Sequence, residues 1–417
     1  MLARSGTIVY QRGFGMANHA AGLAFTPNTP SDGASLAKTF TAAGLWWLAH
    51  EGRVEPDAPV TRYVPEFPHA QTTVRQLLSH SNGLPTDYEY FDPYLAQEEA
   101  RTTQAMLGVI SRQARSPSFV PGTRFEYSSL GFDVGALLIE RVSGQRYEDF
   151  LNERFFSRLG MRASFVRPAR LSEWPGVRTL GYRWRDAGWV PFDVFDMEAF
   201  RGGSNIYFSA SDLSRWASAN AAGTAVPAAV SVAGQRRTEV AGQRTGLTSL
   251  NWYCDPTDTR CYYTGNLNAF YSVVYWDRER DESVVYVSNS TLPPWRRAGL
   301  ARELVDALAG TPGRKSTSAV FERFDRETRS AVAGTYVANG FGPVTVTAGT
   351  QGLRMRIADG LEYDLFAVSR DVLYAPGLDF WLAFSERTPP STLHLRSMFV
   401  DTVLHRVQNR GAAKPPE

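Results

Sequence analysis

The sequence predicts an α+β fold followed by a small antiparallel β-domain. Three patterns indicate this class within the 417 residues. Apolar residues recur at helical spacing in several segments of the first half. Aromatic and β-branched segments separated by turn residues fill residues 246–290, and short alternating segments fill residues 330–408, as in a small barrel or sandwich. Because the stretch GTPGRKSTS at 310–318 has the composition of a linker, we predict domains at residues 1–312 and 319–417.

The helices of the first domain are predicted from apolar spacing and from residues that end a helix. A strand or hairpin at residues 5–17 precedes them. Each of the first four helices ends at glycine, or at Asn-Gly followed by proline. A fifth helix starts after Ser209, where Ser209 and Asp212 resemble a capping box. The first four cover residues 35–50, 74–85, 130–144 and 147–160.

The strands are predicted from alternation and β-propensity. The segments TSLNWYC, CYYTGN, AFYSVVYW and ESVVYVSN are interpreted as consecutive antiparallel strands, and a helix at residues 293–310 is expected to return to the sheet that they form. In the second domain the predicted strands are GTYVA, PVTVTA, GLRMRIA, YDLFAVS, DVLYA, FWLAF and MFVDTVLHRV.

Composition and charge exclude several classes of protein. Apolar residues make up 43% and charged residues 21%, and the formal net charge of +2 leaves no electrostatic footprint for nucleic acid or for a membrane surface. No apolar run is long enough to span a bilayer. The histidines lack metal-ligand spacing, and neither a phosphate-binding loop nor a dinucleotide fingerprint occurs. We therefore expect a small-molecule substrate, with no metal, no cofactor and no nucleic-acid partner.

The two cysteines, Cys254 and Cys261, flank the turn-like sequence DPTDTR between two aromatic strands. A hairpin would bring them close enough for a disulfide, which would indicate an oxidising compartment. The alternative is two free thiols in a cytosolic protein, and the spacing alone leaves both open.

A serine and a lysine at the start of the first helix could carry chemistry. Lysine occurs only three times, and Lys38 follows Ser35 at a spacing that puts both side chains on one helix face. A serine hydroxyl is a weak nucleophile until a base removes its proton, and a buried lysine can become such a base, whereas arginine cannot. The alternative interpretation assigns the pair no catalytic role: Ser35 would cap the helix, and Lys38 would face solvent.

An ordered set of blocks resembles the serine β-lactamase and penicillin-binding protein superfamily, in its class C-like branch. The blocks span about residues 5–310 and follow the order found in that superfamily. The resemblance implies an antiparallel sheet flanked by helices, an all-helical subdomain at about residues 40–200, and an active cleft between them. The segment AGTYVANGFGPVTV is similar to the lipocalin-like barrel appended to many such hydrolases. The similar blocks are SLAKTFTA, EGRVEPDAPVTRYVPEFP, TVRQLLSHSNGLP, PGTRFEYSSLGFDVGALLIERVSGQRYEDFL, RGGSNIYFSASDLSRW and YTGNLNAFYS.

The resemblance implies a role for each motif residue. Ser35 would be the acylated nucleophile, and Lys38 would be the base that activates it. Tyr127 would relay a proton to the leaving group. The alternative is that Tyr127 is a half-buried tyrosine of a strand or loop with no catalytic role. The backbone N–H groups of Ser35 and Asn266 would form the oxyanion hole.

Two motifs depart from the pattern of the family. The second motif usually ends in asparagine, and here Ser129 takes that place. The third usually begins with lysine or histidine, and here it is Tyr263-Thr264-Gly265. We expect these four residues to bind substrate, although Tyr263 could equally be a packing aromatic. The cation that would pair with a β-lactam or peptide carboxylate is therefore missing from this strand, as in esterases of the family, which often carry an aromatic residue there.

The leading hypothesis is a serine hydrolase that forms an acyl-enzyme at Ser35 and acts on carboxylic esters or small amides. The alternatives are a D,D-peptidase, D-aminopeptidase or β-lactamase, an acyltransferase, and a non-catalytic binder. A periplasmic or secreted location is expected, with the cytoplasm as the alternative. Relatives usually carry a helix and a strand before GTIVYQRGFG, so a truncated start that lost a signal peptide would fit this sequence. The oligomeric state is not predicted.

Overall fold

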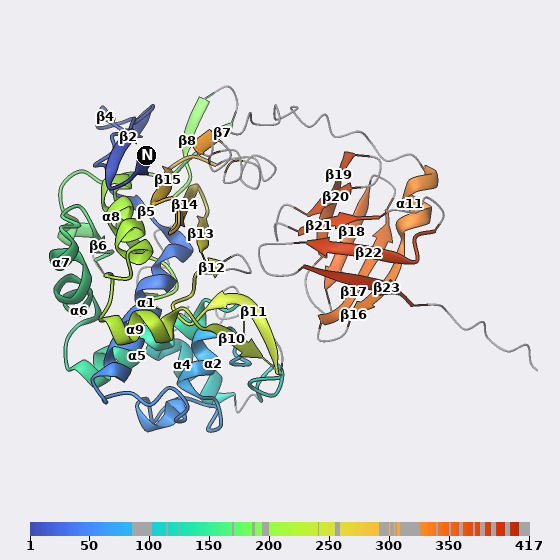
Figure 1. The fold of residues 1–417 in the computed structure, drawn as a ribbon, viewed down its shortest axis with the longest axis horizontal. Coiled ribbons are helices and arrows are strands. Elements are labelled where there is room, and N and C mark those ends of the chain that lie inside the picture. The colour runs from blue at the N-terminus through green and yellow to red at the C-terminus, as the bar shows by residue number, and fades with distance from the viewer. Residues whose placement is uncertain are drawn as a thin grey trace, which may run out of the picture. The chain divides into compact units, whose positions relative to one another are not determined.

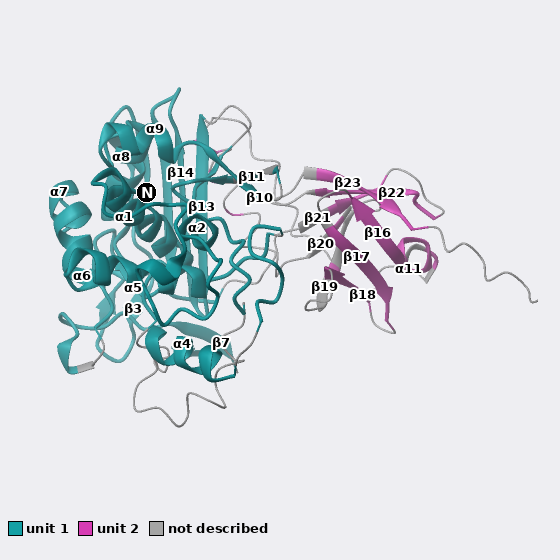
Figure 2. Ribbon diagram, turned by 90° about the horizontal axis from the view of Figure 1, so that it is seen from below, with its two compact units in different colours: residues 1–292 teal, residues 293–417 magenta. Residues whose placement is uncertain are grey.

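The computed structural model divides the chain into two compact units, residues 1–292 and 293–417 (Figure 2). The predicted boundary at residues 312–319 lies further along the chain, among residues outside the described part. The helix predicted at 293–310 also lies mostly outside it. The structure describes residues 1–85, 102–113, 116–123, 125–168, 171–185, 188–193, 200–240, 242–254, 259–291, 300, 304, 307–308 and 326–407, the last with gaps at 339–340, 350–351, 358–361, 370–371, 376–379, 385–388 and 397–400.

The first unit is built on an eight-stranded antiparallel sheet in the order β10-β11-β12-β13-β14-β15-β1-β2 (Figure 1). The strands predicted at 246–290 form its centre. The start of the chain completes it, because β1 pairs with β15 with Leu2 opposite Val284. The strands are β1 (Leu2–Arg4), β2 (Thr7–Tyr10), β10 (Arg237–Val240), β11 (Gln243–Thr248), β12 (Tyr253–Cys254), β13 (Arg260–Leu267), β14 (Phe270–Asp277) and β15 (Glu282–Ser288).

Helices cover this sheet and form the subdomain beside it. Helix α8 packs on β14 and β15, and α1 packs on α5 and α9. The apolar residues of α1 are buried along almost its whole length, which places the helix inside the molecule. The main helices are α1 (Ala37–His50), α2 (Val74–Leu78), α4 (Thr103–Arg112), α5 (Leu130–Ser143), α6 (Tyr147–Leu151), α7 (Ser157–Leu159), α8 (Ala210–Ala221) and α9 (Ala228–Gly234).

The helical run ends earlier than predicted. It stops at Leu159, whereas the expectation extended to about residue 200. Short strands follow instead, because segments of two to four residues carry too little periodicity to be distinguished from loop. They pair within two small sheets, β5-β9-β6 and β7-β8. The strands are β5 (Ser31–Asp32), β6 (Phe165–Val166), β7 (Tyr182–Arg185), β8 (Gly188–Pro191) and β9 (Ile206–Phe208), with β3 (Met16–Asn18) and β4 (Leu23–Ala24) paired separately.

Two helix ends follow the expected stop signals, whereas the helix predicted at residues 74–85 already ends at Leu78. Gly144 and Gly160 adopt left-handed conformations with φ of 72° and 68°, which glycine reaches without the steric cost of a Cβ. At the start of α8, the Ser209 hydroxyl accepts a hydrogen bond from the backbone N–H of Asp212. The predicted capping box is only half formed, because the Asp212 carboxylate accepts instead from the backbone N–H of Ala163 and from the Ser164 hydroxyl.

The second unit is an antiparallel barrel that β16 and β23 close, with Tyr336 opposite Arg406. Its strands follow one another in chain order, as in an up-and-down barrel. Sequence analysis missed β22, a short strand that follows two prolines. Tyr336, Met355 and Leu393 lie in its apolar core. The strands are β16 (Gly334–Ala338), β17 (Phe341–Ala348), β18 (Leu353–Ile357), β19 (Glu362–Ser369), β20 (Val372–Ala375), β21 (Phe380–Ala383), β22 (Thr392–Arg396) and β23 (Asp401–Arg406), preceded by helix α11 (Arg326–Val332).

Candidate active site

Ser35 lies in a short 3-10 turn, Ala34–Leu36, that leads directly into α1. The turn is strained, because Ala34 has a φ of +49°, a conformation that few residues other than glycine adopt. Two side chains hold it. The Asp32 carboxylate accepts from the backbone N–H of Ala34 at 2.7 Å, and the Ser272 hydroxyl of β14 donates to the Gly33 carbonyl at 2.7 Å. Ser35 is thereby presented on a rigid turn.

The structure brings together the three residues predicted to be catalytic. Lys38 Nζ donates to Ser35 Oγ at 3.1 Å, and the Tyr127 hydroxyl donates to the same oxygen at 2.8 Å. The Lys38 ammonium lies 4.9 Å from the centre of the Tyr127 ring. Both partners therefore point at the atom that must lose a proton to become a nucleophile, and either can accept that proton once it is itself deprotonated.

Lys38 is fully buried and does not face solvent. Its ammonium donates at 2.7 Å to the carbonyl of Gly203, and the N–H of Gly203 donates at 2.9 Å to the Asp133 carboxylate of α5. A buried cation needs such partners, because the loss of hydration would otherwise be too costly. The Gly203 backbone thus connects the buried lysine to a buried carboxylate.

The two glycines of the RGGSN segment are required by close packing. Gly202 has a φ of +112°, and a Cβ there would lie 2.3 Å from the Phe132 carbonyl oxygen. A Cβ on Gly203 would lie 2.9 Å from the Ser129 carbonyl oxygen. Because only glycine fits at both positions, the segment can lie against the start of α5 and present its carbonyl to Lys38.

The pKa of Tyr127 lies below its ordinary value. Burial acts to raise the pKa, but the charge of Lys38 and the hydrogen-bonding contacts with Lys38, Ser35 and Tyr263 outweigh that effect. The side chain is nevertheless 37% exposed, so it remains open to solvent. A tyrosine with a lowered pKa and an open face is suited to exchange protons with a bound substrate.

Strand β13 approaches the nucleophile at Gly265. A Cβ on Gly265 would lie 2.1 Å from the Gly33 carbonyl oxygen and 3.0 Å from the Ser35 backbone nitrogen. Any larger residue would therefore push the strand away from the serine. Asn266 follows on the strand and is exposed, which is compatible with the proposed oxyanion pair of the Ser35 and Asn266 N–H groups.

The other residues expected to bind substrate differ in their accessibility. Thr264 and Ser129 are half-buried. Tyr263 is only 1% exposed: its ring stacks on Tyr253 at 5.3 Å, and its hydroxyl accepts from the Asn251 amide at 3.1 Å. It also acts on Tyr127, whose pKa it lowers. Tyr263 therefore lies behind Tyr127, where it can act on that tyrosine.

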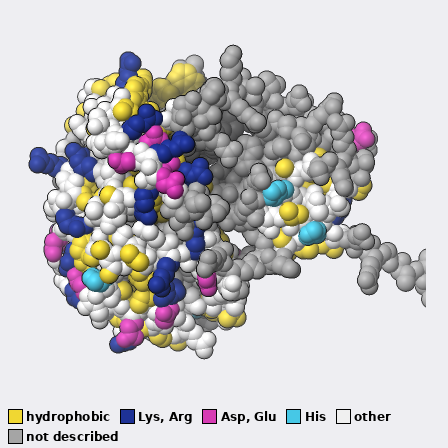
Figure 3. Space-filling view, in the orientation of Figure 1, with side chains coloured by type: hydrophobic (Ala, Val, Ile, Leu, Met, Phe, Trp, Pro, Cys, Tyr) yellow, Lys and Arg dark blue, Asp and Glu magenta, His cyan; other side chains and the backbone are white. Residues whose placement is uncertain are grey.

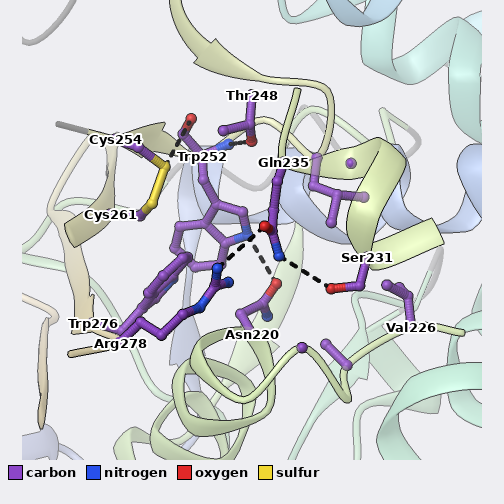
Figure 4. A pocket seen from close by; sticks show the side chains of 14 residues that line it. Asn220, Val226, Ser231, Gln235, Thr248, Trp252, Cys254, Cys261, Trp276 and Arg278 are labelled. Carbon is purple, nitrogen blue, oxygen red and sulfur yellow. Dashed lines mark hydrogen bonds between the residues drawn. A yellow bond between two sulfur atoms is a disulfide. The ribbon is translucent and has the colours of Figure 1, made fainter. Parts of the chain in front are cut away.

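Cys254 and Cys261 form a disulfide between β12 and β13, where they are register partners (Figure 4). The bond lies beside a small cavity of about 20 Å³, whose lining includes Trp252, Asn220 and Arg278. In Figure 4 the Trp252 indole N–H points at Asn220, to which it donates at 3.0 Å. The lining of this cavity does not include Ser35, Lys38 or Tyr127, so the cavity is separate from the candidate site.

Several residues of the site were not singled out from the sequence. Asp133 and Ser272 act on backbone atoms of distant segments, and no local spacing reveals such contacts. Asp32 acts on the backbone N–H of Ala34, two residues further on, which is a local contact. His80 and Asn251 were also missed, and their place is described below. The available signals were weak: His80 lies in the block TVRQLLSHSNGLP and Gly203 in the block RGGSNIYFSASDLSRW, and both blocks resemble the family without marking these residues.

On the face drawn in Figure 3, basic and acidic side chains are interspersed and form no patch of a single sign. Among the described residues, no helix is both long and apolar enough to cross a membrane. In the same part of the chain, no cluster of three or more His, Cys, Asp or Glu side chains is placed to hold a metal ion.

Comparison with known proteins identifies the family. The β-lactamase family model matches residues 1–309. Penicillin-binding protein 4* of Bacillus subtilis is 31% identical over 172 residues, which cover 41% of this chain and 38% of that protein. Esterase EstB of Burkholderia gladioli is 29% identical over 255 residues, covering 52% of this chain and 63% of the esterase. The chain thus matches less than two thirds of the length of either relative.

Solved structures show the same fold. The octameric penicillin-binding protein homologue from Pyrococcus abyssi matches with a TM-score of 0.66 and 21% identity, covering 97% of this chain and 94% of that one. The α+β prediction and the resemblance of the first domain to the β-lactamase and penicillin-binding protein superfamily are confirmed by these matches. The lipocalin-like character of the second domain stays a prediction. With the family model spanning nearly three quarters of its residues, the chain belongs to the β-lactamase family.

Proposed function

We propose that this protein is a serine hydrolase that forms an acyl-enzyme at Ser35 and hydrolyses carboxylic esters or small amides. One observation carries the proposal: Ser35 Oγ lies within hydrogen-bond distance of both Lys38 Nζ and the Tyr127 hydroxyl. In the acylation step Ser35 Oγ attacks the substrate carbonyl, its proton passes to the Lys38–Tyr127 pair, and the leaving group departs with a proton from that pair. Water then gives a proton to the same pair as it attacks the acyl carbonyl, the bond to Ser35 Oγ breaks, the carboxylic acid leaves, and the pair returns a proton to Ser35 Oγ.

The third-motif strand favours neutral substrates. Tyr263 replaces the usual cation, is buried, and uses its hydroxyl to accept a hydrogen bond from Asn251. A substrate carboxylate would gain no charge-assisted bond from this position. Esters and small amides need no such partner, whereas penicillins and D,D-peptides present a carboxylate. The esterase among the relatives is consistent with this choice, and the penicillin-binding relative keeps the second class as the alternative.

The test is the intact mass of the protein after mixing with a p-nitrophenyl ester and, separately, with a penicillin. We expect nitrophenol release and a transient mass gain of one acyl group with the ester. Both should disappear in Ser35→Ala. Ester turnover that survives in Ser35→Ala would refute the proposal, and a stable penicillin adduct without ester turnover would favour the alternative class.

Lys38→Arg is the matched variant for the role of the lysine. Arginine keeps the positive charge but does not deprotonate near neutral pH. If Lys38 takes the serine proton, acylation should slow by about 10² to 10⁴-fold. A variant that retains the rate of the wild type would assign the proton transfer to Tyr127 alone.

Addition of alcohol or amine acceptors to the same assay separates hydrolysis from acyl transfer.

The disulfide supports a location in an oxidising compartment. Such bonds persist in the periplasm or outside the cell and are rare in the cytosol. We therefore propose a periplasmic or secreted protein, and the redox state of Cys254 and Cys261 in protein isolated under thiol-blocking conditions tests it. Free thiols in such a sample would contradict the proposed location.

A further inference from the structure

A buried histidine packs against the catalytic tyrosine. His80 follows α2, is fully buried, and stacks its ring on that of Tyr127 with 4.5 Å between centres and 20° between planes. Its backbone carbonyl accepts from the N–H of Glu126 at 2.7 Å, and its Nδ1 accepts from the N–H of Ser128 at 3.1 Å. The histidine thus binds the residues immediately before and after Tyr127 while its ring supports the ring of Tyr127.

The hydrogen bond from Ser128 selects the tautomer of this histidine. Because Nδ1 accepts a hydrogen bond from Ser128, it carries no hydrogen itself, so the neutral ring must hold its hydrogen on Nε2. Burial, together with the charge of Lys38, lowers the pKa of His80 to about 3, which keeps the ring neutral at working pH. The ring therefore offers one acceptor toward Ser128 and one donor on the opposite side.

The donor side faces Asn251, in the loop between β11 and β12. Within the described chain, His80 Nε2 and Asn251 Oδ1 each lack a partner at full hydrogen-bond geometry. The two groups are nevertheless near enough for Asn251 to raise the pKa of His80 against the effect of burial, as an acceptor does. Both residues adopt left-handed backbone conformations, with φ of 54° and 62°. Such strain in two buried, facing residues is typical of functional sites.

The Asn251 amide extends the chain of contacts to Tyr127. When its Oδ1 faces His80, its Nδ2 is directed at the Tyr263 hydroxyl, to which it donates at 3.1 Å. Since the Tyr263 oxygen then accepts, its own hydrogen is free to point at Tyr127. The contact with Tyr263 lowers the pKa of Tyr127, as donation to its oxygen would.

We propose that His80 is a positioning residue for Tyr127, acting through the backbone on either side of it and through Asn251 and Tyr263, which direct a hydrogen bond at the Tyr127 oxygen. This inference rests on the proposed function, because it assigns Tyr127 a role in proton transfer. The titratable groups that face Tyr127 are Lys38 from α1, Tyr263 from β13, Tyr253 from β12 and His80 itself.

The test is His80→Asn, which separates the two actions of the histidine. Asparagine tolerates the left-handed backbone, and its amide oxygen can replace Nδ1 as the acceptor for Ser128. It cannot reach Asn251 as Nε2 does. We expect kcat for ester hydrolysis to fall about tenfold with KM within about twofold, because proton transfer is impaired and binding is not. The ascending limb of the pH–rate profile should move to higher pH, since Tyr127 loses the contact that lowers its pKa.

A double-mutant cycle with Tyr263→Phe shows whether the two residues act together. If His80 acts through Tyr263, the phenylalanine variant already lacks the hydrogen bond, and adding His80→Asn should cost little more. An additive loss, or a pH–rate limb that stays where it is in the wild type, would overturn the proposal and leave His80 as a packing residue.

Three further measurements keep the outcome interpretable. His69→Asn is the matched control, because His69 is also buried but packs edge-on against Phe67. This variant should change neither the rate nor the pH profile.

If His80→Asn fails to fold, Asn251→Gly preserves the left-handed backbone and should shift the same limb of the pH–rate profile. No shift in that variant counts against the proposal. The rate at which a fluorophosphonate labels Ser35, followed against pH, does not depend on the natural substrate, so it distinguishes a wrong substrate class from a wrong role for His80.

Discussion

At the residue scale, the candidate site depends on buried polar groups whose partners are backbone atoms. Asp32 shows this most clearly. Its carboxylate is 1% exposed and holds the strained Ala34 in place through the Ala34 N–H. Burial raises the pKa of Asp32 to about 7, while the Ala34 N–H and the charge of Arg167 act in the opposite direction. Burial thus raises the pKa of the Asp32 carboxyl group, and the same group holds the turn that carries the nucleophile.

This pKa makes the stability of the protein depend on pH in a defined window. The folded state binds a proton at Asp32 up to about pH 7, whereas the unfolded state releases it near the ordinary value of 3.8. The contribution of Asp32 to the free energy of unfolding is therefore complete below about pH 4 and is lost as the pH rises through 7. We expect Asp32→Asn, which keeps an acceptor for Ala34, to remove this dependence.

Urea unfolding of wild type and Asp32→Asn at pH 4, 5.5, 7 and 8.5 measures the effect. The free energy of unfolding of the wild type relative to the variant should fall between pH 4 and 7 and stay level above it. At about 1.4 kcal/mol per pKa unit the fall is at most a few kcal/mol. A difference that is constant across the whole range would mean that the pKa of Asp32 is not raised.

The sequence could predict the residues that share a short spacing, and it could not predict those that meet only in the fold. Ser35 and Lys38 lie one helical turn apart, so their proximity follows from the helix alone. The convergence of Tyr127 on them was anticipated only through the resemblance to a family. His80 and Asn251 belong to segments distant in sequence and meet through two left-handed turns. No periodicity encodes that contact, and this explains why sequence analysis missed both.

At the element scale, the β12–β13 hairpin carries the disulfide, and its strand β13 continues into the candidate active site. Cys261 and Tyr263 lie on β13, and the same strand reaches the nucleophile turn at Gly265. Elements with clear alternation, such as β13 to β15, were predicted from the sequence. Those that were missed, such as Thr392–Arg396 and Phe165–Val166, are short strands whose existence depends on a neighbouring strand to pair with.

Removal of the disulfide tests how much this hairpin contributes to stability. Cys254 and Cys261 are seven residues apart, so the bond closes a short loop, and its loss should cost about 2 kcal/mol of unfolding free energy. The measurement is urea unfolding of the wild type with and without a reducing agent. The double variant Cys254→Ser/Cys261→Ser is the control and should not respond to the reductant. Equal stability of the oxidised and reduced wild type would show that β12 and β13 are held by the sheet alone.

At the scale of the whole molecule, each unit forms its strand pairs internally. Among the described residues, strands β1 to β15 pair with one another, and β16 to β23 close into a barrel without an edge. A closed barrel buries its own core and needs no partner sheet. We therefore propose that the catalytic unit folds without the barrel, and the question is where the unit ends.

Two observations place that end differently. The division into compact units falls at residue 292, whereas the family model continues to residue 309. The segment between them, predicted as a helix from its apolar spacing, includes Leu308, which is 5% exposed. A leucine this little exposed packs against other apolar side chains. We propose that residues 293–310 belong to the first unit, as the predicted boundary at residue 312 implies.

Chains that end at residue 312 and at residue 292 test this assignment. The longer chain should unfold cooperatively and acylate Ser35 at the rate of the full protein, because it retains every pairing of the central sheet. The shorter chain should be less stable by at least 2–3 kcal/mol, roughly the contribution of one or two large apolar side chains that lose their burial. Urea unfolding followed by tryptophan fluorescence, together with the rate of labelling by a fluorophosphonate, measures both. Equal stability of the two chains would assign residues 293–310 to the linker, and loss of labelling in the longer chain would make the barrel a part of the catalytic machinery.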